Sequence, residues 1–502
     1  MMLQRAACRP SVGAGVGLRL SSAPSTAVRA APRWTRLYSA GGHPKPKSSS
    51  RALPAVAAVL AGGVGYQLAE YQKTSKSGAI PTLTGPVDLD ALTKSPVDSG
   101  SFETADAKLR EDVFVGSFTA EGKNTHVHAA RVASNHPVED MMAVSLAPGV
   151  GKSETLFNGV YDGHAGWATS VVLKDALIPA VSAPLSQLPS GAPDSTIDTT
   201  IVKAFTDLDD LLFANAQKAV DGLKAGTCET ADSRVTSVLA PVIAGSCALL
   251  SIFDPVTSTL RVACTGDSRA VLGSIPAGAT SYASLELSKD QNGRNPDEFD
   301  RLAKEHPGEE ADMIDPKSGR LFGIAVTRAF GDHRWKWDND FITHIHQNFW
   351  GTGPRPKTKT APYMTAAPVV TTTKIESPDF VILASDGLWD HISSKDAVEC
   401  VSQWIAAKKA GKQTPHDKLA ATRGQKSELD MTYGWPNWYA KPENFVVEDL
   451  DNAAVHLIKN ALGGARRTLF TGVALAYPPL SRSVRDDVTV QVIFFQDPAK
   501  SG

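Results

Sequence analysis

Cysteine is scarce in this chain, and no two cysteines form a Cys-x-x-Cys pair. The 502 residues contain five: Cys8, Cys228, Cys247, Cys264 and Cys400. Isolated cysteines of this kind indicate neither a disulfide framework nor a zinc site. We expect them to be buried apolar residues in a reducing compartment, so any metal ion should be held by oxygen ligands.

A strong net charge is also lacking. The formal charge of -2 at pH 7 gives no whole-chain argument for binding nucleic acid or a membrane surface. We therefore predict no nucleic-acid partner. The 42% of hydrophobic and 21% of charged residues are typical of a globular protein with a sizeable core.

Acidic residues are missing from the beginning of the chain, where the first is Glu70. Arginines are spread through the same stretch, at Arg5, Arg9, Arg19, Arg29, Arg33 and Arg36. An Arg-rich, Ser/Ala-rich and acid-free composition is typical of a mitochondrial transit peptide, which we predict over residues 1–40. The alternative is a disordered basic tail on a cytosolic protein.

The apolar run over residues 52–68 is slightly short for a transmembrane helix, which needs about 20 residues. We expect it to be an inner-membrane anchor, a weak helix or part of a two-step sorting signal. An inserted run would leave the basic flank in the matrix and the remaining chain in the intermembrane space. Otherwise the protein would reside in the matrix. Residues 69–101, rich in Ser, Thr, Pro and Gly, are predicted to be a linker.

Several predicted strands end at a carboxylate. The run 156–161 stops at Asp162, 259–264 leads to Asp267, and 380–385 stops at Asp386, with Asp390 one turn further on. Asp486 directly precedes the closing strand, 488–495. A single Asp-Gly is most simply a turn. Four strand-end motifs together indicate one shared site, and carboxylates are the oxygen ligands that suit Mg²⁺ or Mn²⁺.

These segments occur in an order that resembles the motif series of the type 2C (PPM) metal-dependent protein phosphatases. The motifs are Glu139-Asp140, Asp162-Gly163-His164-Ala165-Gly166, Gly245-Ser246, Gly266-Asp267-Ser268-Arg269, Arg328-Ala329-Phe330-Gly331-Asp332, Asp386-Gly387-Leu388-Trp389-Asp390 and Arg485-Asp486-Asp487. The resemblance covers residues 102–498. Within the family, the chain looks most like the mitochondrial pyruvate dehydrogenase phosphatases and their fungal relatives.

The resemblance implies two metal ions, Mg²⁺ or Mn²⁺, with a weaker third. Asp162 is expected to bridge the first two. Glu139 and the Gly163 carbonyl would complete the shell of one ion, and Asp386 and Asp486 that of the other. The third ion would be served by Asp267 and Asp390.

The resemblance also implies attack by a metal-activated water on a phosphoserine or phosphothreonine, with no phosphoenzyme. His164 matches the family's proposed general acid for the leaving oxygen, and a histidine suits that task at neutral pH. The expected partner is a phosphoprotein substrate, with pyruvate dehydrogenase as one candidate. The alternative function is a catalytically silent regulatory module, although such relatives usually lose metal carboxylates that this chain retains.

One residue departs from the common family pattern. Many members carry an arginine that grips the phosphate four residues before the glutamate, where this chain has Asn135. Arg131 is expected to be a plain surface residue. His126 and His128 alternate on a predicted strand and are also expected at the surface.

Two insertions, 349–357 and 411–443, are candidates for selecting the substrate, because insertions in this family lie near the rim of the active site. The first mixes aromatic, basic and proline residues, and a plain surface loop is its alternative. The resemblance further implies an α+β fold, a four-layer α-β-β-α sandwich of two mostly antiparallel sheets flanked by helices. Helical patterns at 201–223, 397–408 and 450–462 fit the outer layers.

Overall fold

The computed structural model describes residues 100–349, 351–376, 378–414, 429–432 and 436–500, all of which belong to one compact unit of the chain. The predicted presequence and the apolar run over residues 52–68 lie outside the described residues. The same holds for the predicted linker, apart from its last two positions.

Six antiparallel strands form one sheet in the order β1-β2-β14-β13-β9-β10. They are β1 (Val113–Ala120), β2 (Lys123–Val132), β14 (Val488–Phe494), β13 (Phe380–Ala384), β9 (Arg269–Ser274) and β10 (Ala283–Glu286). The strand latest in the sequence, β14, therefore lies inside the sheet, between β2 and β13.

A second antiparallel sheet has five strands in the order β12-β8-β7-β4-β3. They are β12 (Val369–Lys374), β8 (Thr259–Thr265), β7 (Ala248–Asp254), β4 (Glu154–Tyr161) and β3 (Met141–Pro148). A short three-stranded ladder joins β11 (Phe330–Gly331), β6 (Gly245–Ser246) and β5 (Gly163–His164).

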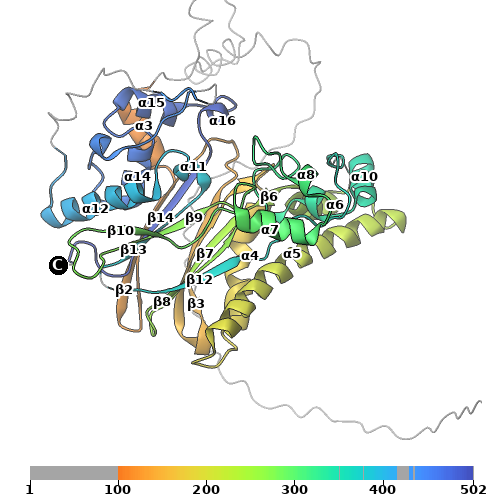
Figure 1. Ribbon diagram of the computed structural model, residues 1–502, viewed down its shortest axis with the longest axis horizontal. Coiled ribbons are helices and arrows are strands. Elements are labelled where there is room, and N and C mark those ends of the chain that lie inside the picture. The colour runs from red at the N-terminus through yellow and green to blue at the C-terminus, as the bar shows by residue number, and fades with distance from the viewer. Residues whose placement is uncertain (1–99, 350, 377, 415–428, 433–435, 501–502) are drawn as a thin grey trace, which may run out of the picture. The chain divides into compact units, whose positions relative to one another are not determined.

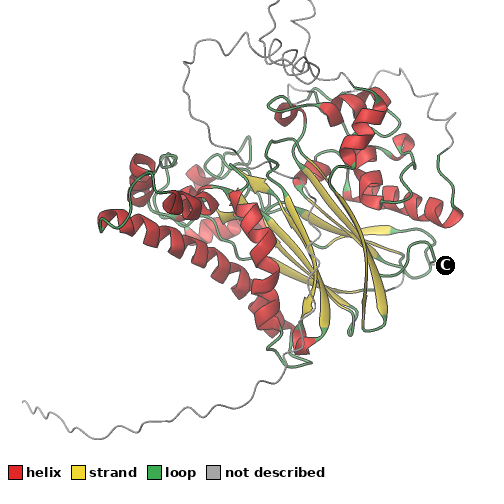
Figure 2. Ribbon diagram, turned by 180° about the vertical axis from the view of Figure 1, so that it is seen from behind, coloured by secondary structure: helices red, strands yellow, loops and turns green. Residues whose placement is uncertain are grey.

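The two large sheets face each other across a buried apolar layer (Figure 2). Val160 and Leu249 contribute to this layer from one sheet, and Val381 and Ile493 from the other. Because strand side chains alternate between faces, the neighbours of Ile493 on β14 pack against the helices instead.

Helices cover both outer faces (Figure 1). The six-stranded sheet is covered by α3 (Phe102–Leu109), α12 (Ser394–Ala410), α14 (Ala453–Ala461) and α15 (Arg467–Leu475), and the five-stranded sheet by α4 (Ala168–Leu185) and α5 (Asp194–Lys224). The remaining helices are α6 (Ser233–Ile243), α7 (Pro296–Glu305), α8 (Glu310–Met313), α9 (His333–Lys336), α10 (Asn339–Asn348), α11 (Asp386–Trp389) and α16 (Ser481–Val484). The predicted four-layer α-β-β-α sandwich is confirmed.

Of the described helices, α4 alone is long and apolar enough to cross a membrane. Its buried face includes Leu173, Leu177 and Val181, which pack with Phe157 of β4 in the core under the five-stranded sheet. It is placed as a core helix of the sandwich.

Two surface predictions are wrong. His128 is only 5% exposed, because the layer of α12 and α14 covers the outer face of β2 and brings the ring of Trp404 to 5.3 Å from the imidazole. Arg131 is largely buried too, and its guanidinium pairs with Asp112 and donates to the carbonyl of Asp140. Strand periodicity places two residues on one face, but it does not tell which face the helices cover.

Candidate active site

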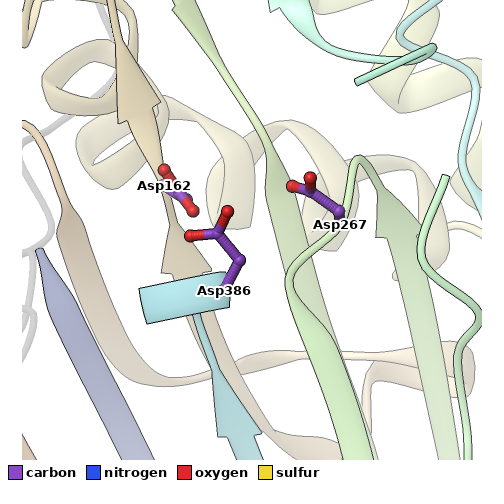
Figure 3. A group of neighbouring side chains, drawn as sticks. All are labelled: Asp162, Asp267 and Asp386. Atoms are coloured by element: carbon purple, nitrogen blue, oxygen red, sulfur yellow. The ribbon is translucent and has the colours of Figure 1, made fainter. Parts of the chain in front are cut away.

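Three strand-end carboxylates meet at one edge of the sandwich. Asp162 follows β4, Asp267 follows β8, and Asp386 follows β13 as the first residue of α11. Each offers an oxygen, and these oxygens all lie within 4.8 Å of one another. Figure 3 shows the three carboxyl groups directed toward a common space. The strands of two different sheets thus deliver one cluster.

The cluster carries strong mutual repulsion. Burial, followed by the charges of neighbouring carboxylates, raises the pKa of Asp162 and of Asp386 well above the usual range. Burial and the charge of Asp290 raise the pKa of Asp267 to about 6. Asp390, one turn of α11 beyond Asp386, has its pKa raised to about 6 by burial and by Asp486. Carboxyl groups gathered in this way are costly to ionise unless a cation compensates them.

Glu139 lies at the border of the cluster with both carboxylate oxygens hydrogen-bonded. Asn135 Nδ2 donates to Oε2 at 2.8 Å, and the Gly166 amide donates to Oε1 at 2.6 Å. Burial raises the pKa of Glu139, and the Gly166 amide opposes that rise. Asn135 therefore holds the glutamate in place. Gly163 is equally confined, since a Cβ there would lie 2.3 Å from the Glu139 carbonyl oxygen.

Asp486 approaches from the turn before β14. Its carboxylate pairs with Arg482 of α16, and its Oδ1 accepts the Asp487 amide at 2.7 Å. The Arg482 side chain is 43% exposed. Its charge acts on Glu139 as well as on Asp486, so Arg482 is a partly open cation at the border of the carboxylate cluster.

Asp487, which sequence reasoning left without a role, organises the loop that carries Glu139. Its Oδ1 accepts the amides of Ser134 and Asn135, and its Oδ2 accepts the amide of Glu139 at 2.8 Å. The signal was present in the sequence as a second aspartate directly beside Asp486. Asp487 thus positions a candidate ligand without facing the cluster itself.

His164 is held by a partner that its own segment does not supply. Its Nε2 lies 2.7 Å from Oδ2 of Asp332, a carboxylate that is only 2% exposed. Burial lowers the pKa of His164, but the charge and hydrogen bond of Asp332 outweigh burial, so the net shift is upward. Asp332 was visible only as the end of the Arg328–Asp332 motif. Pairing of β11 and β5 with β6 brings it to His164.

The donor set fits a hard divalent cation. The cluster offers buried carboxylate oxygens from Asp162, Asp267 and Asp386, with no sulfur or imidazole ligand among them. Oxygen-rich, highly charged sites of this kind suit Mg²⁺ or Mn²⁺. The cation would offset the repulsion that burial imposes on these groups.

Comparison with known proteins agrees with this geometry. Residues 131–426 match the family model for protein phosphatase 2C. A protein phosphatase 2C homolog from Schizosaccharomyces pombe is 35% identical over 85% of this chain and 88% of its own length. The mitochondrial [pyruvate dehydrogenase [acetyl-transferring]]-phosphatase 1 of Saccharomyces cerevisiae is 34% identical over 73% of this chain and 68% of its own length.

The chain belongs to the protein phosphatase 2C family. It is a metal-dependent protein serine/threonine phosphatase. Among solved structures, a serine-threonine phosphatase 2C from Toxoplasma gondii is 17% identical, covers 76% of this chain and 99% of that one, and aligns with a TM-score of 0.41.

Proposed function

We propose that this protein removes phosphate from phosphoserine or phosphothreonine in a mitochondrial phosphoprotein, with pyruvate dehydrogenase as the first substrate to test. The observation that carries the reaction is the cluster of Asp162, Asp267 and Asp386 beside the His164–Asp332 pair. The mitochondrial setting is supported by the acid-free N-terminal sequence and by the mitochondrial phosphatase of Saccharomyces cerevisiae to which the chain is similar.

We assign the cation ligands as the family resemblance implies. Asp162 is the central ligand, Glu139 and the Gly163 carbonyl lie on one side, and Asp386 and Asp486 on the other. Asp267 and Asp390 are assigned to a weaker additional ion. A divalent cation bound there would supply positive charge for the phosphate oxygens and lower the pKa of the water that attacks phosphorus.

A residue of the chain protonates the leaving group. As the water oxygen bonds to phosphorus, the bond to the serine oxygen breaks, and that oxygen needs a proton. His164 is the group placed to donate it, and Asp332 stabilises the protonated ring through the 2.7 Å contact. The products are inorganic phosphate and a free hydroxyl side chain.

A first experiment tests the reaction itself. The purified full chain should release phosphate from a phosphoserine peptide with Mn²⁺ or Mg²⁺ and stop when EDTA is added. Asp162→Asn should lose at least about a hundredfold in kcat/KM, because it removes the central carboxylate. Asp254→Asn is the matched control, since Asp254 also ends a strand but closes the β7–β8 hairpin turn.

Absence of metal-dependent hydrolysis by folded protein would favour the silent regulatory module. The substrate and compartment need separate tests. Phosphorylated pyruvate dehydrogenase should be dephosphorylated by the wild type and not by Asp162→Asn. Protease treatment of mitoplasts should leave a matrix enzyme intact, whereas cleavage of residues 102–498 would place them in the intermembrane space and contradict the pyruvate dehydrogenase assignment.

A further inference from the structure

Two neighbouring arginines have no partner among the described residues. Arg334 belongs to α9, and Arg355 lies in the segment after α10. Both are half-buried, yet neither side chain forms an ion pair or hydrogen bond with any described residue, and the Nε atom of each is buried. Other half-buried arginines use their donors, as Arg269 does in an ion pair with Asp290, Arg328 in an ion pair with Glu298, and Arg466 in a hydrogen bond to the Tyr439 carbonyl.

One indole ring brings the two charges together. The guanidinium carbon of Arg355 lies 4.6 Å from the centroid of the Trp335 ring, and that of Arg334 lies 5.8 Å from it. Trp335 is only 4% exposed and is fixed by a hydrogen bond from its Nε1 to the Leu321 carbonyl at 3.0 Å. Stacking on a fixed aromatic ring orients guanidinium groups without using their N–H donors.

The two guanidinium groups are partly buried and repel each other. Burial, and then the charge of Arg355, lower the pKa of Arg334, while burial is the largest influence on Arg355. Two like charges that are partly removed from water, and that form no ion pair with a described residue, cost free energy that a bound anion would recover. Each guanidinium presents a planar set of donors that matches a carboxylate or a phosphate.

The pair lies next to the catalytic histidine's partner. Arg334 is two residues beyond Asp332, and the charge of Asp332 acts on Arg355. Gly323 faces Arg355, and even a Cβ at position 323 would come within 3.3 Å of Nη1, so the glycine leaves this side of the guanidinium uncrowded. Because Asp332 contacts His164 at 2.7 Å, a phosphoserine bound beside His164 would bring its flanking residues toward this pair.

We propose that Arg334 and Arg355 form an anion subsite that receives an acidic side chain of the phosphoprotein, located within a few residues of the phosphoserine. The occupant is a carboxylate or a second phosphate of the same substrate segment. The enzyme then selects phosphorylation sites in an acidic sequence context. This inference rests on the proposed function and specifies its substrate class.

The test compares three phosphoserine peptides that differ only in their flanks: alanine, aspartate, or a second phosphoserine. The wild-type full chain with Mn²⁺ should show a kcat/KM for the aspartate peptide about tenfold above that for the alanine peptide, the scale of one charge-assisted contact. The doubly phosphorylated peptide should be preferred at least as strongly. In Arg334→Gln/Arg355→Gln, the ratio of acidic to alanine peptide should fall to about one.

Binding gives a second readout that needs no turnover. In EDTA, the fluorescence anisotropy of labelled peptides should give the same ratio of dissociation constants, and added salt should reduce it. Arg234→Gln is the matched control, because it removes one arginine that is 82% exposed and paired with Asp232 on α6. It should keep the wild-type ratio. Arg355→Gln alone replaces the double variant if thermal melting shows that the latter is unfolded.

Different results would contradict the proposed function and the anion subsite. If wild-type protein with Mn²⁺ does not hydrolyse p-nitrophenyl phosphate, a substrate without flanks, the proposed function is wrong. If it hydrolyses that substrate but treats aspartate and alanine peptides alike, the anion subsite is wrong. The anion subsite is also wrong if the arginine variants still prefer acidic peptides over the alanine peptide. It is wrong as well if the variants differ from the wild type in their binding of free inorganic phosphate but not in their binding of any peptide.

Discussion

At the scale of single residues, the site depends on side chains that touch the candidate ligands rather than on the ligands alone. Asp332 orients His164, Asp487 gathers the amides of the Glu139 loop, and Asn135 donates to Glu139. None of these three side chains is assigned to a cation. Each holds a catalytic or binding group in one orientation, which is the role of outer-shell partners in metal-dependent enzymes.

Asp332→Asn should impair the reaction in a way that depends on the leaving group. The variant weakens the support for a protonated His164, so kcat for a phosphoserine peptide should fall about a hundredfold. Hydrolysis of p-nitrophenyl phosphate should fall much less, because nitrophenolate leaves without a proton. Steady-state kinetics of both substrates checks this, with exposed Asp210→Asn as the control. Equal losses on both substrates would contradict the general-acid role.

Arg482→Gln should have two effects of opposite sign. The Arg482 charge competes with a cation for Asp486, so its removal should tighten Mn²⁺ binding about fivefold. The Arg482 guanidinium is also partly exposed and could bind a substrate phosphate near Asn135. Without it, KM for a phosphopeptide should rise about fivefold. Titration of activity with Mn²⁺ and with peptide separates the two. A variant in which both constants move the same way would argue against this assignment.

The residues of the cluster could be predicted from the sequence, but the side-chain contacts that hold the site in place could not. Asp162, Asp267 and Asp386 each lie within two residues of the end of an apolar strand, and such a position is visible in the chain. The contact of Asp332 with His164 spans a long sequence separation and depends on how short strands pair. The burial of His128 depends in the same way on which face of β2 the helices cover.

At the scale of elements, the ladder β5-β6-β11 sets the distance between His164 and Asp332. The central strand, β6, pairs with β5 on one side and β11 on the other, and Gly245 is the residue opposite both His164 and Gly331. Strand runs of this kind are too short to carry a periodic pattern, so the sequence predicted the flanking strands and left this ladder out. In the structure, Cys247 alone separates β6 from β7.

Gly245→Ala should separate His164 from Asp332. A Cβ at this position would lie 2.1 Å from His164 Nε2 and 2.3 Å from Asp332 Oδ2, far inside contact distance. We expect loss of phosphopeptide hydrolysis comparable with that of Asp332→Asn, with a stability cost of about 1–3 kcal/mol from overpacking. Mn²⁺ binding measured by calorimetry should persist, because the carboxylate cluster is not touched. Gly472→Ala is a suitable control, since no heavy atom lies within 4 Å of a Cβ there and Gly472 lies inside the helix α15, where alanine is well tolerated.

At the scale of the whole molecule, three buried histidines lie on the six-stranded sheet or in the layer that covers it. Burial is the main cause that lowers the pKa of His128, His391 and His456 to about 4. The folded state keeps them neutral, whereas the unfolded chain protonates them below about pH 6.5. Above that pH, keeping these histidines neutral costs the folded state nothing relative to the unfolded chain. As the pH falls from about 6.5 to about 4, protonation of the unfolded chain lowers the free energy of unfolding.

The contribution of each histidine to the free energy of unfolding should therefore decrease by about 2 kcal/mol between about pH 7 and pH 5. His391, which stacks on Trp438 with ring centroids 4.0 Å apart, offers the cleanest variant. In His391→Gln, the decrease should be smaller by that amount. Urea unfolding of the wild type and the variant at both pH values measures this difference in pH dependence. The contribution of the acidic cluster is the same in both proteins and therefore drops out of the comparison. An identical pH dependence would rule out a neutral His391.

The position of β14 has a consequence for biosynthesis. Residues 488–494 fill the space between β2 and β13, so during translation both neighbours keep unpaired edges until nearly the whole domain has left the ribosome. The adjoining Asp486 arrives equally late. A nascent chain can therefore assemble the five-stranded half earlier, but it gains its complete acidic cluster only after Asp486 and β14 have been synthesised. A chain that lacks β14 would present two unpaired strand edges and an incomplete acidic cluster, so we expect it to depend on chaperones.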